Sequence, residues 1–211
     1  MAKSITEFKS QLKKGGARPN LFLVRLTFPT SISQIVDIGN VQTAQNLQKQ
    51  AEFLVKTAQI PSSNIGTIEV PFRGRMLKVA GDRTFEPWSV TIINDGSFEI
   101  RQAFEAWSRG INALTENASQ LGYGSDGGKS YCADMTVFQL SRDNQNPSKT
   151  PANPNNGEGA ELEVIRAYKF YDAWPSAISS IDLSFEANDQ IEEFTVEFQY
   201  NFFEATSKSL S

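Results

Sequence analysis

The stretch KVAGDRTFEPWSVTIINDGSFEIRQAFEAW, Lys78 to Trp107, decides the fold that the sequence predicts. Trp88 to Ile92 alternates apolar and polar residues, which is typical of a half-buried strand. Asn94-Asp95-Gly96-Ser97 has the residue types of a turn and of a helix N-cap. The apolar residues that follow recur at helical spacing on one stripe: Ile100, Ala103, Phe104, Trp107 and Ile111. The stretch therefore predicts strand, turn, strand, turn and a core-facing helix.

A β-hairpin is expected immediately before this stretch and overlapping its start. Two β-rich runs, Ile65 to Phe72 and Met76 to Ala80, face each other across Arg73-Gly74, and a glycine between such runs is a hairpin signal. Pro71 predicts poor pairing near the tip, since proline cannot donate to a strand ladder. We expect this hairpin to project as an arm.

The rest of the chain adds strands more than helices. Alternating or β-rich runs predict strands at residues 21–28, 53–58, 135–140, 162–171, 181–186 and 194–202. Trp174-Pro175 is expected to break the chain, and Asn188-Asp189 to turn it. A short amphipathic helix is predicted between Ser4 and Lys14, where Ile5, Phe8 and Leu12 are spaced three and four apart.

These elements predict a mainly β fold: two packed antiparallel sheets, sandwich- or barrel-like, with one flanking α-helix and the projecting hairpin. Residues 1–211 are expected to form a single domain, without a linker or an internal repeat. Residues 30–51 and 143–160 are polar and are interpreted as loop insertions.

Composition excludes several classes of function. The chain has no histidine, which removes the commonest general base and metal ligand and every Ser-His or Cys-His pair. The single cysteine, Cys132, cannot form an internal disulfide and is interpreted as a buried or incidental thiol. A net charge of −4 argues against tight nucleic-acid binding. No signal peptide is expected, and no apolar run approaches the ~20 residues of a membrane span.

Two motifs could carry chemistry, and both have a simpler explanation. Glu186, Asp189, Glu192, Glu193 and Glu197 could supply paired carboxylates, but alternation with an apolar face favours one solvated or lumen-facing sheet face. The run 122–130, which ends in Gly-Lys-Ser, lacks the glycine spacing of a phosphate-binding loop and is interpreted as a flexible loop. We therefore expect no enzymatic activity, no cofactor and no metal.

The stretch from Ala80 to Trp107 resembles the tail tube protein family of T4-type contractile-tailed bacteriophages. The resemblance is carried by Ala80 to Phe85, Trp88, Asn94-Asp95 and the helix with Arg101, Phe104 and Trp107. It continues in other segments of the chain: Ala17 to Phe22, Thr57 to Pro61, Trp174-Pro175 followed by Ile181, and Asn188 to Phe194.

The resemblance implies a structural virion protein that polymerises as stacked hexameric rings into an inner tail tube. Closing a ring would pair strand edges that a single copy leaves open. Tail sheath and baseplate proteins are the implied partners, and genomic DNA would pass through an acidic lumen without specific binding during ejection. The implied location is the virion tail, assembled in the host cytoplasm. A baseplate or tube-initiator protein and the inner tube of a related injection system are the alternatives, and a carboxylate-dependent hydrolase is the rival from another class.

Two surfaces are hypothesised to matter for assembly. Arg73, Gly74, Arg75, Met76 and Lys78 form the hairpin tip, which we expect to contact a neighbouring subunit, with a merely solvated turn as the alternative. Glu193 and Glu197 lie on the polar side of the last strand, which faces either the lumen or the sheath.

Overall fold

The computed structural model describes residues 4–12, 16–29, 44–123, 130–144 and 162–206. The chain forms two compact units. The larger one comprises Val24–Thr136 and Lys169–Glu204, and the smaller one comprises Met1–Leu23, Val137–Tyr168 and Ala205–Ser211. That residues 1–211 fold as one domain stays a prediction.

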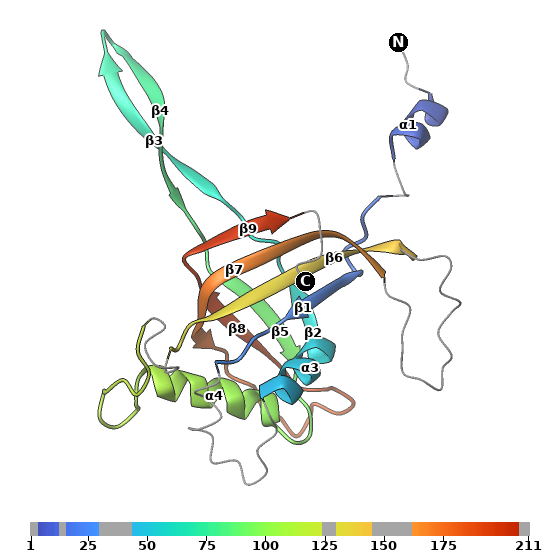
Figure 1. Ribbon diagram of the computed structural model, residues 1–211, viewed down its shortest axis with the longest axis vertical. Helices are drawn as coiled ribbons and strands as arrows, with labels where there is room; N and C mark the ends of the chain where they lie inside the picture. Colours follow the sequence, from blue (N-terminus) through green and yellow to red (C-terminus); the bar gives the residue numbers. More distant parts are fainter. Residues whose placement is uncertain (1–3, 13–15, 30–43, 124–129, 145–161, 207–211) are drawn as a thin grey trace. The chain divides into compact units, whose positions relative to one another are not determined.

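The described structure is mainly β, with more residues in strands than in helices, as predicted (Figure 1). One seven-stranded sheet has the order β1-β6-β7-β8-β5-β2, with β9 paired to β7, and a separate two-stranded sheet consists of β3 and β4. The strands are β1 (Phe22–Arg25), β2 (Val55–Ala58), β3 (Asn64–Phe72), β4 (Arg75–Thr84), β5 (Trp88–Ile93), β6 (Ala133–Asn144), β7 (Leu162–Ile178), β8 (Glu193–Gln199) and β9 (Phe202–Thr206). The predicted mainly β class, with a helix and a hairpin, is confirmed.

The core of the larger unit lies between helix α4 (Glu99–Ile111) and the inner face of β5 and β8. Strand β5 pairs antiparallel with β8 along its whole length, from Trp88 opposite Phe198 to Ile93 opposite Glu193. The Phe104 ring of α4 lies 5.8 Å from that of Phe198. The predicted helical stripe is confirmed, since all of its members except Ile111 are buried.

The sheet of the larger unit curls over its own core. β5 and β7 are separated by β8 in the sheet order, yet the rings of Trp88 and Phe170 stack with centroids 4.4 Å apart. A flat sheet would keep side chains two strands apart out of contact. The Trp88 indole N–H is satisfied by the carbonyl of Gln59 at 2.8 Å, so burial leaves no donor unpaired.

The smaller unit begins with helix α1 (Ile5–Gln11). Ser4 and Glu7 form a reciprocal capping box, which explains why so short a helix starts where it does. Its apolar side is exposed, as Phe8 shows at 66%. Further along, the Gln139 amide donates to the carbonyls of Arg18 and Leu21, and ties the entry of β1 to β6.

Several boundaries differ from the prediction near the first insertion and at the hairpin. Residues 44–54, placed in a loop and a strand, form helix α3 (Ala44–Leu54), which buries Leu47 and Ala51. Residues 30–43 lie outside the described residues. The helix α4 has Phe98 rather than Asn94–Ser97 as its N-cap. Poor pairing was predicted near Pro71, but β3 stays paired with β4 there: Pro71 lies opposite Met76, and Phe72 lies opposite Arg75.

Three predictions for strands of the C-terminal region are wrong. Trp174-Pro175 was predicted to break the chain, but strand β7 continues through it. The pairing with β8 shifts register between Pro175 and Ala177, and a bulge of this kind tolerates a proline, which has no N–H to donate. The predicted last strand is interrupted at Tyr200-Asn201 and resumes as β9. Residues 181–186, predicted as a strand, form none. Of the second insertion, residues 145–160 lie outside the described part, as do 124–129 of the glycine-rich run.

Candidate self-association surface

The hairpin of β3 and β4 is a long two-stranded arm closed by the two-residue turn Arg73-Gly74. Both turn residues have positive φ, 46° at Arg73 and 80° at Gly74. A two-residue turn with positive φ at both positions matches the twist of the flanking strands. Glycine adopts this conformation without strain, which explains its place in the turn. At the base, a Cβ on Gly81 would lie 3.2 Å from the carbonyl oxygen of Gly66, so the strands approach closely there.

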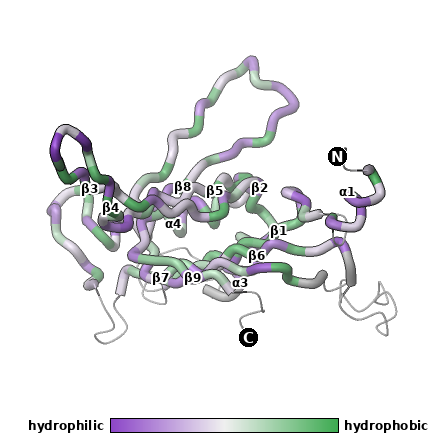
Figure 2. The backbone as a smooth tube through the Cα atoms, turned by 90° about the horizontal axis from the view of Figure 1, so that it is seen from above, coloured by the Kyte–Doolittle hydropathy of each residue, from purple (hydrophilic) through white to green (hydrophobic). Residues whose placement is uncertain are grey.

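The register gives the hairpin one apolar and one polar face. Residues directly opposite each other share a face, and every second residue along a strand returns to it. The apolar face consists of Ile68, Val70, Phe72, Leu77 and Val79, with Arg75 at its tip. The polar face consists of Thr67, Glu69, Pro71, Met76, Lys78 and Ala80. Figure 2 shows this interleaving of hydrophobic and hydrophilic residues along β3 and β4.

The apolar face is uncovered in the single chain. Its five apolar side chains are between 43% and 65% exposed. An isolated two-stranded ribbon is marginally stable in water, and monomeric proteins rarely leave such a contiguous apolar surface open. The face therefore has the properties of a contact surface whose partner is absent from one copy of the chain.

The predicted tip residues are all exposed, but they divide between the two faces. Arg73 lies over the Phe72 ring, 5.5 Å from its centroid, and Arg75 ends the apolar face. Lys78 lies on the polar face, where its ammonium is 3.9 Å from the Glu69 carboxylate. Arg73 and Arg75 are therefore the cations that border the apolar face. Sequence reasoning selected the charged tip and missed the apolar face, although alternation of Ile68, Val70 and Phe72 could have indicated it.

The predicted acidic face lies on the outer side of β5 and β8. Glu197 is exposed, whereas Glu193 is partly covered and accepts from Lys56 Nζ at 2.5 Å. Thr91 and Thr195 face each other on the same side, with their hydroxyl oxygens 3.2 Å apart. This face is polar apart from Ile93 and is less acidic than predicted, because Lys56 neutralises one of its two carboxylates. Its orientation toward a lumen or a sheath stays a prediction.

Comparison with known proteins assigns the family. The family model described as phage tail tube protein matches residues 17–206. The chain belongs to this family.

Individual tail tube proteins are similar over nearly the whole chain. Tail tube protein gp19 of Enterobacteria phage T4 is 27% identical over 190 residues, which cover 89% of this chain and 91% of that protein. The tail tube protein of Serratia phage KSP90 is 26% identical over 206 residues, 97% of each chain. The resemblance to T4-type tail tube proteins is confirmed.

Two solved structures share the fold of this tail tube protein. One is a chain of the anti-feeding prophage baseplate, with a TM-score of 0.53, 12% identity, and coverage of 90% of this chain and 95% of that one. The other belongs to the extended sheath–tube complex of the PVC extracellular contractile injection system, with a TM-score of 0.50, 14% identity, and coverage of 98% and 99%. At these identities the likeness concerns the fold alone.

A structural, non-enzymatic role follows from membership in the tail tube family. The environment of Cys132 is consistent with this structural role. Burial, together with the nearby Asp172 carboxylate, raises the pKa of the Cys132 thiol to about 11. A thiol with so high a pKa stays protonated at neutral pH and is a poor nucleophile. Among the residues that the structure describes, no three acidic or cysteine side chains gather as a metal site, and no helix could cross a membrane.

Proposed function

We propose that this tail tube protein polymerises as stacked hexameric rings into the inner tube of a contractile tail. The observation that carries the proposal is the uncovered apolar face of the hairpin, which a second copy of the chain would cover. Family membership supports a tube as the product, and the proteins with the same fold come from a sheath–tube complex and a baseplate.

The energetics favour many simultaneous contacts over a simple dimer. Full burial of a Val, Leu, Ile or Phe side chain contributes about 1.5–3 kcal/mol. Because these five residues are already about half buried in one copy, covering the remainder contributes on the order of 5 kcal/mol. Association of two free proteins costs about 4–15 kcal/mol. One hairpin contact is therefore marginal, whereas a ring that presents all its hairpins at once adds their contributions with little further entropic cost.

The wider role includes partners that a tube requires. Sheath and baseplate proteins would bind the outside and the end of the tube, and the genome would pass through the lumen during ejection. Assembly would take place in the host cytoplasm and end in the virion tail. The polar outer face of β5 and β8, with Glu197 exposed, supports a surface along which a polyanion slides without being held.

Electron microscopy of purified hairpin variants tests the proposal. We expect hollow rods from the unchanged protein and from Thr67→Glu, which adds a charge to the polar face. Val70→Glu adds the same charge to the apolar face, where desolvation of a carboxylate costs several kcal/mol. We expect it to raise the concentration needed for polymerisation more than about 100-fold, which corresponds to about 2.7 kcal/mol.

The outcomes separate the alternatives. Isolated rings that never extend would favour a tube initiator over a tube subunit. Rods from Val70→Glu at the unchanged concentration would show that the apolar face is not a contact. A chain that stays monomeric at every concentration, even with a baseplate seed, would refute the proposed function. Circular dichroism of each variant is the control that tests whether the monomer is still folded after the exposed substitution.

A further inference from the structure

The chain between β7 and β8, Ser179–Glu192, forms a second uncovered surface in the larger unit, here called the acidic segment. It contains no strand, and its apolar side chains point into solvent: Leu183 is 80% exposed, Phe185 106% and Ile191 71%. Four of its residues are acidic, Asp182, Glu186, Asp189 and Glu192, and none is Lys or Arg. It therefore combines exposed apolar groups with negative charge.

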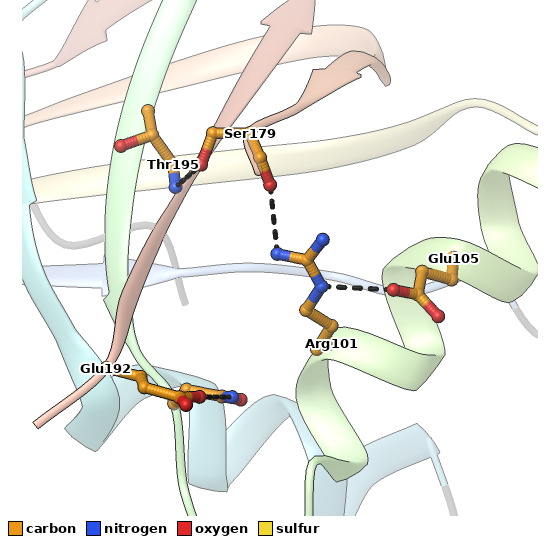
Figure 3. A network of polar contacts seen from close by, with 6 residues as sticks. Arg101, Glu105, Ser179, Glu192 and Thr195 are labelled. Atoms are coloured by element: carbon orange, nitrogen blue, oxygen red, sulfur yellow. Dashed lines mark hydrogen bonds and ion pairs between the residues drawn. The ribbon is translucent and has the colours of Figure 1, made fainter. Parts of the chain in front are cut away.

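Both ends of the acidic segment are fixed to the core (Figure 3). At its start, Arg101 of α4 donates to the Ser179 carbonyl at 3.0 Å, and the Thr195 backbone N–H donates to the Ser179 hydroxyl at 2.9 Å. At its end, Asn94 donates to Glu192 twice, from its backbone N–H to the carbonyl at 2.8 Å and from its side chain to the carboxylate at 3.1 Å. The segment thus leaves the core at two defined points.

Within the acidic segment lies an open hollow of about 340 Å³. Ile181, Leu183 and Ile191 line it together with the acidic residues Asp182, Glu192 and Glu193 and the uncharged polar residues Ser180, Ser184 and Gln190. Glu192 already accepts from Asn94, whereas Asp182, Glu186 and Asp189 have no ion-pair partner among the described residues. The hollow therefore fits an apolar group that carries a cation beside it.

The hairpin tip has that chemistry. The Phe72 ring lies under the Arg73 guanidinium, and Arg75 stands opposite Phe72 in the register. Apolar surface would meet apolar surface, and two guanidinium groups would meet carboxylates that have no ion-pair partner among the described residues. Charge complementarity of this kind selects the partner and its orientation.

The hairpin and the acidic segment connect to opposite ends of the strand pair formed by β5 and β8. The hairpin enters β5 at Trp88, which is paired with Phe198, whereas the acidic segment enters β8 at Glu193, which is paired with Ile93. Five residue steps along a strand separate these ends by roughly 17 Å. A contact between unlike surfaces cannot form a symmetric dimer, and where the rotation between copies does not close a ring it repeats as an open filament.

We propose that the acidic segment of one copy is the receptor for the hairpin tip of the next copy along the tube. The inference rests on the proposed function and specifies its axial contact: Phe72 enters the hollow, while Arg73 and Arg75 pair with Asp182 and Glu186. The contact also covers Leu183 and Phe185, which are 80% and 106% exposed in one copy.

Charge exchange tests the pairing. Arg73→Glu with Arg75→Glu, and separately Asp182→Lys with Glu186→Lys, are each expected to raise the polymerisation concentration about tenfold or more, because each places like charges in the contact. In a mixture of the two double variants, opposite charges meet again wherever copies of the two variants alternate, so we expect it to polymerise near the unchanged concentration. Glu186→Lys alone has its matched control in Glu116→Lys, the same reversal at an exposed acid elsewhere, which is expected to polymerise normally.

The results distinguish this inference from the proposed function. If the unchanged protein forms no tubes, the proposed function fails. If it forms tubes and the Asp182→Lys/Glu186→Lys variant does so equally well, or if the mixture of variants shows no rescue, only the receptor assignment is overturned. An equal loss with Glu116→Lys would likewise overturn it, since the effect would then not belong to the segment.

A disulfide provides a second measurement that does not depend on charge. In a Cys132→Ser background, Leu77→Cys, on the same face as Phe72, with Leu183→Cys should give a ladder of covalent multimers when tubes are oxidised. Leu77→Cys with Glu116→Cys is the control and should give none. Tubes without a Leu77–Leu183 ladder would place the receptor elsewhere.

Discussion

Strand β5 and residues 181–186 have the same alternation of apolar and polar residues but opposite environments. In β5, Trp88, Val90 and Ile92 alternate with Ser89 and Thr91, and all three apolar side chains are at most 2% exposed. In 181–186, Ile181, Leu183 and Phe185 alternate with Asp182, Ser184 and Glu186, yet Phe185 is wholly exposed and no strand forms.

The difference lies in the neighbours. β5 has β8 on one side and β2 on the other, which pair its backbone, and its Trp88 ring packs against Phe170 and Phe198. Residues 181–186 have no paired strand among the described residues. Alternation therefore specifies which side chains share a face, but burial requires a second surface. In a protein that assembles, that surface can belong to another copy.

The largest effect on stability is expected from Phe198→Ala, in β8, the strand that pairs with β5. The Phe198 ring contacts Trp88, with centroids 5.5 Å apart, and is fully buried. Removing a buried Phe leaves a cavity and costs about 3–5 kcal/mol. We expect that loss in urea unfolding followed by circular dichroism, measured in the Val70→Glu background so that the protein stays monomeric. A loss below about 1 kcal/mol would mean that this core is not closed in the monomer.

A smaller effect is expected where the core holds the acidic segment. Arg101→Ala removes the bond to the Ser179 carbonyl and the cation–π contact with Phe194, whose ring centroid is 5.2 Å from the guanidinium. We expect it to destabilise the monomer by about 1–2 kcal/mol and to speed proteolysis between residues 179 and 192.

Glu105→Ala is the control for Arg101→Ala. It removes only the helical ion pair with Arg101, which is 3.0 Å long and worth about 0.2–0.5 kcal/mol. If Glu105→Ala destabilised the monomer as much as Arg101→Ala, the arginine would act through its own helix and not through the segment.

Much of the fold could be predicted, because burial within one copy leaves a periodic signal. The stripe of α4 and the alternation of β5 and of Phe194, Val196 and Phe198 are examples. Helix α3 was missed because, among its residues of described burial, Leu47 and Ala51 alone are buried, too few for a clear period. Strand β7 was cut at Pro175 because a proline tolerated by a bulge has the same sequence signal as one that ends a strand.

The candidate site was predicted less completely. The turn Arg73-Gly74 located the hairpin, and its basic residues marked the tip. Alternation of Ile68, Val70 and Phe72 could also have indicated the apolar face, but exposure depends on neighbouring elements and does not show in local spacing. The acidic segment was interpreted as a strand for the same reason: the pattern is present, but no described strand pairs with residues 181–186.

The smallest effect on folding is expected from Phe185→Ser, together with the largest contrast between folding and assembly. Because the Phe185 side chain contacts solvent in the monomer, the free energy of unfolding should change by less than about 0.5 kcal/mol. Phe194→Ser, the same substitution at a buried position of β8, should cost about 3 kcal/mol or more. Tube formation by Phe185→Ser should nevertheless require a higher protein concentration, as pelleting assays would show, since the apolar contact with the next copy is lost. A Phe185→Ser protein that pellets like the unchanged one would mean that this exposed ring has no partner in the tube either.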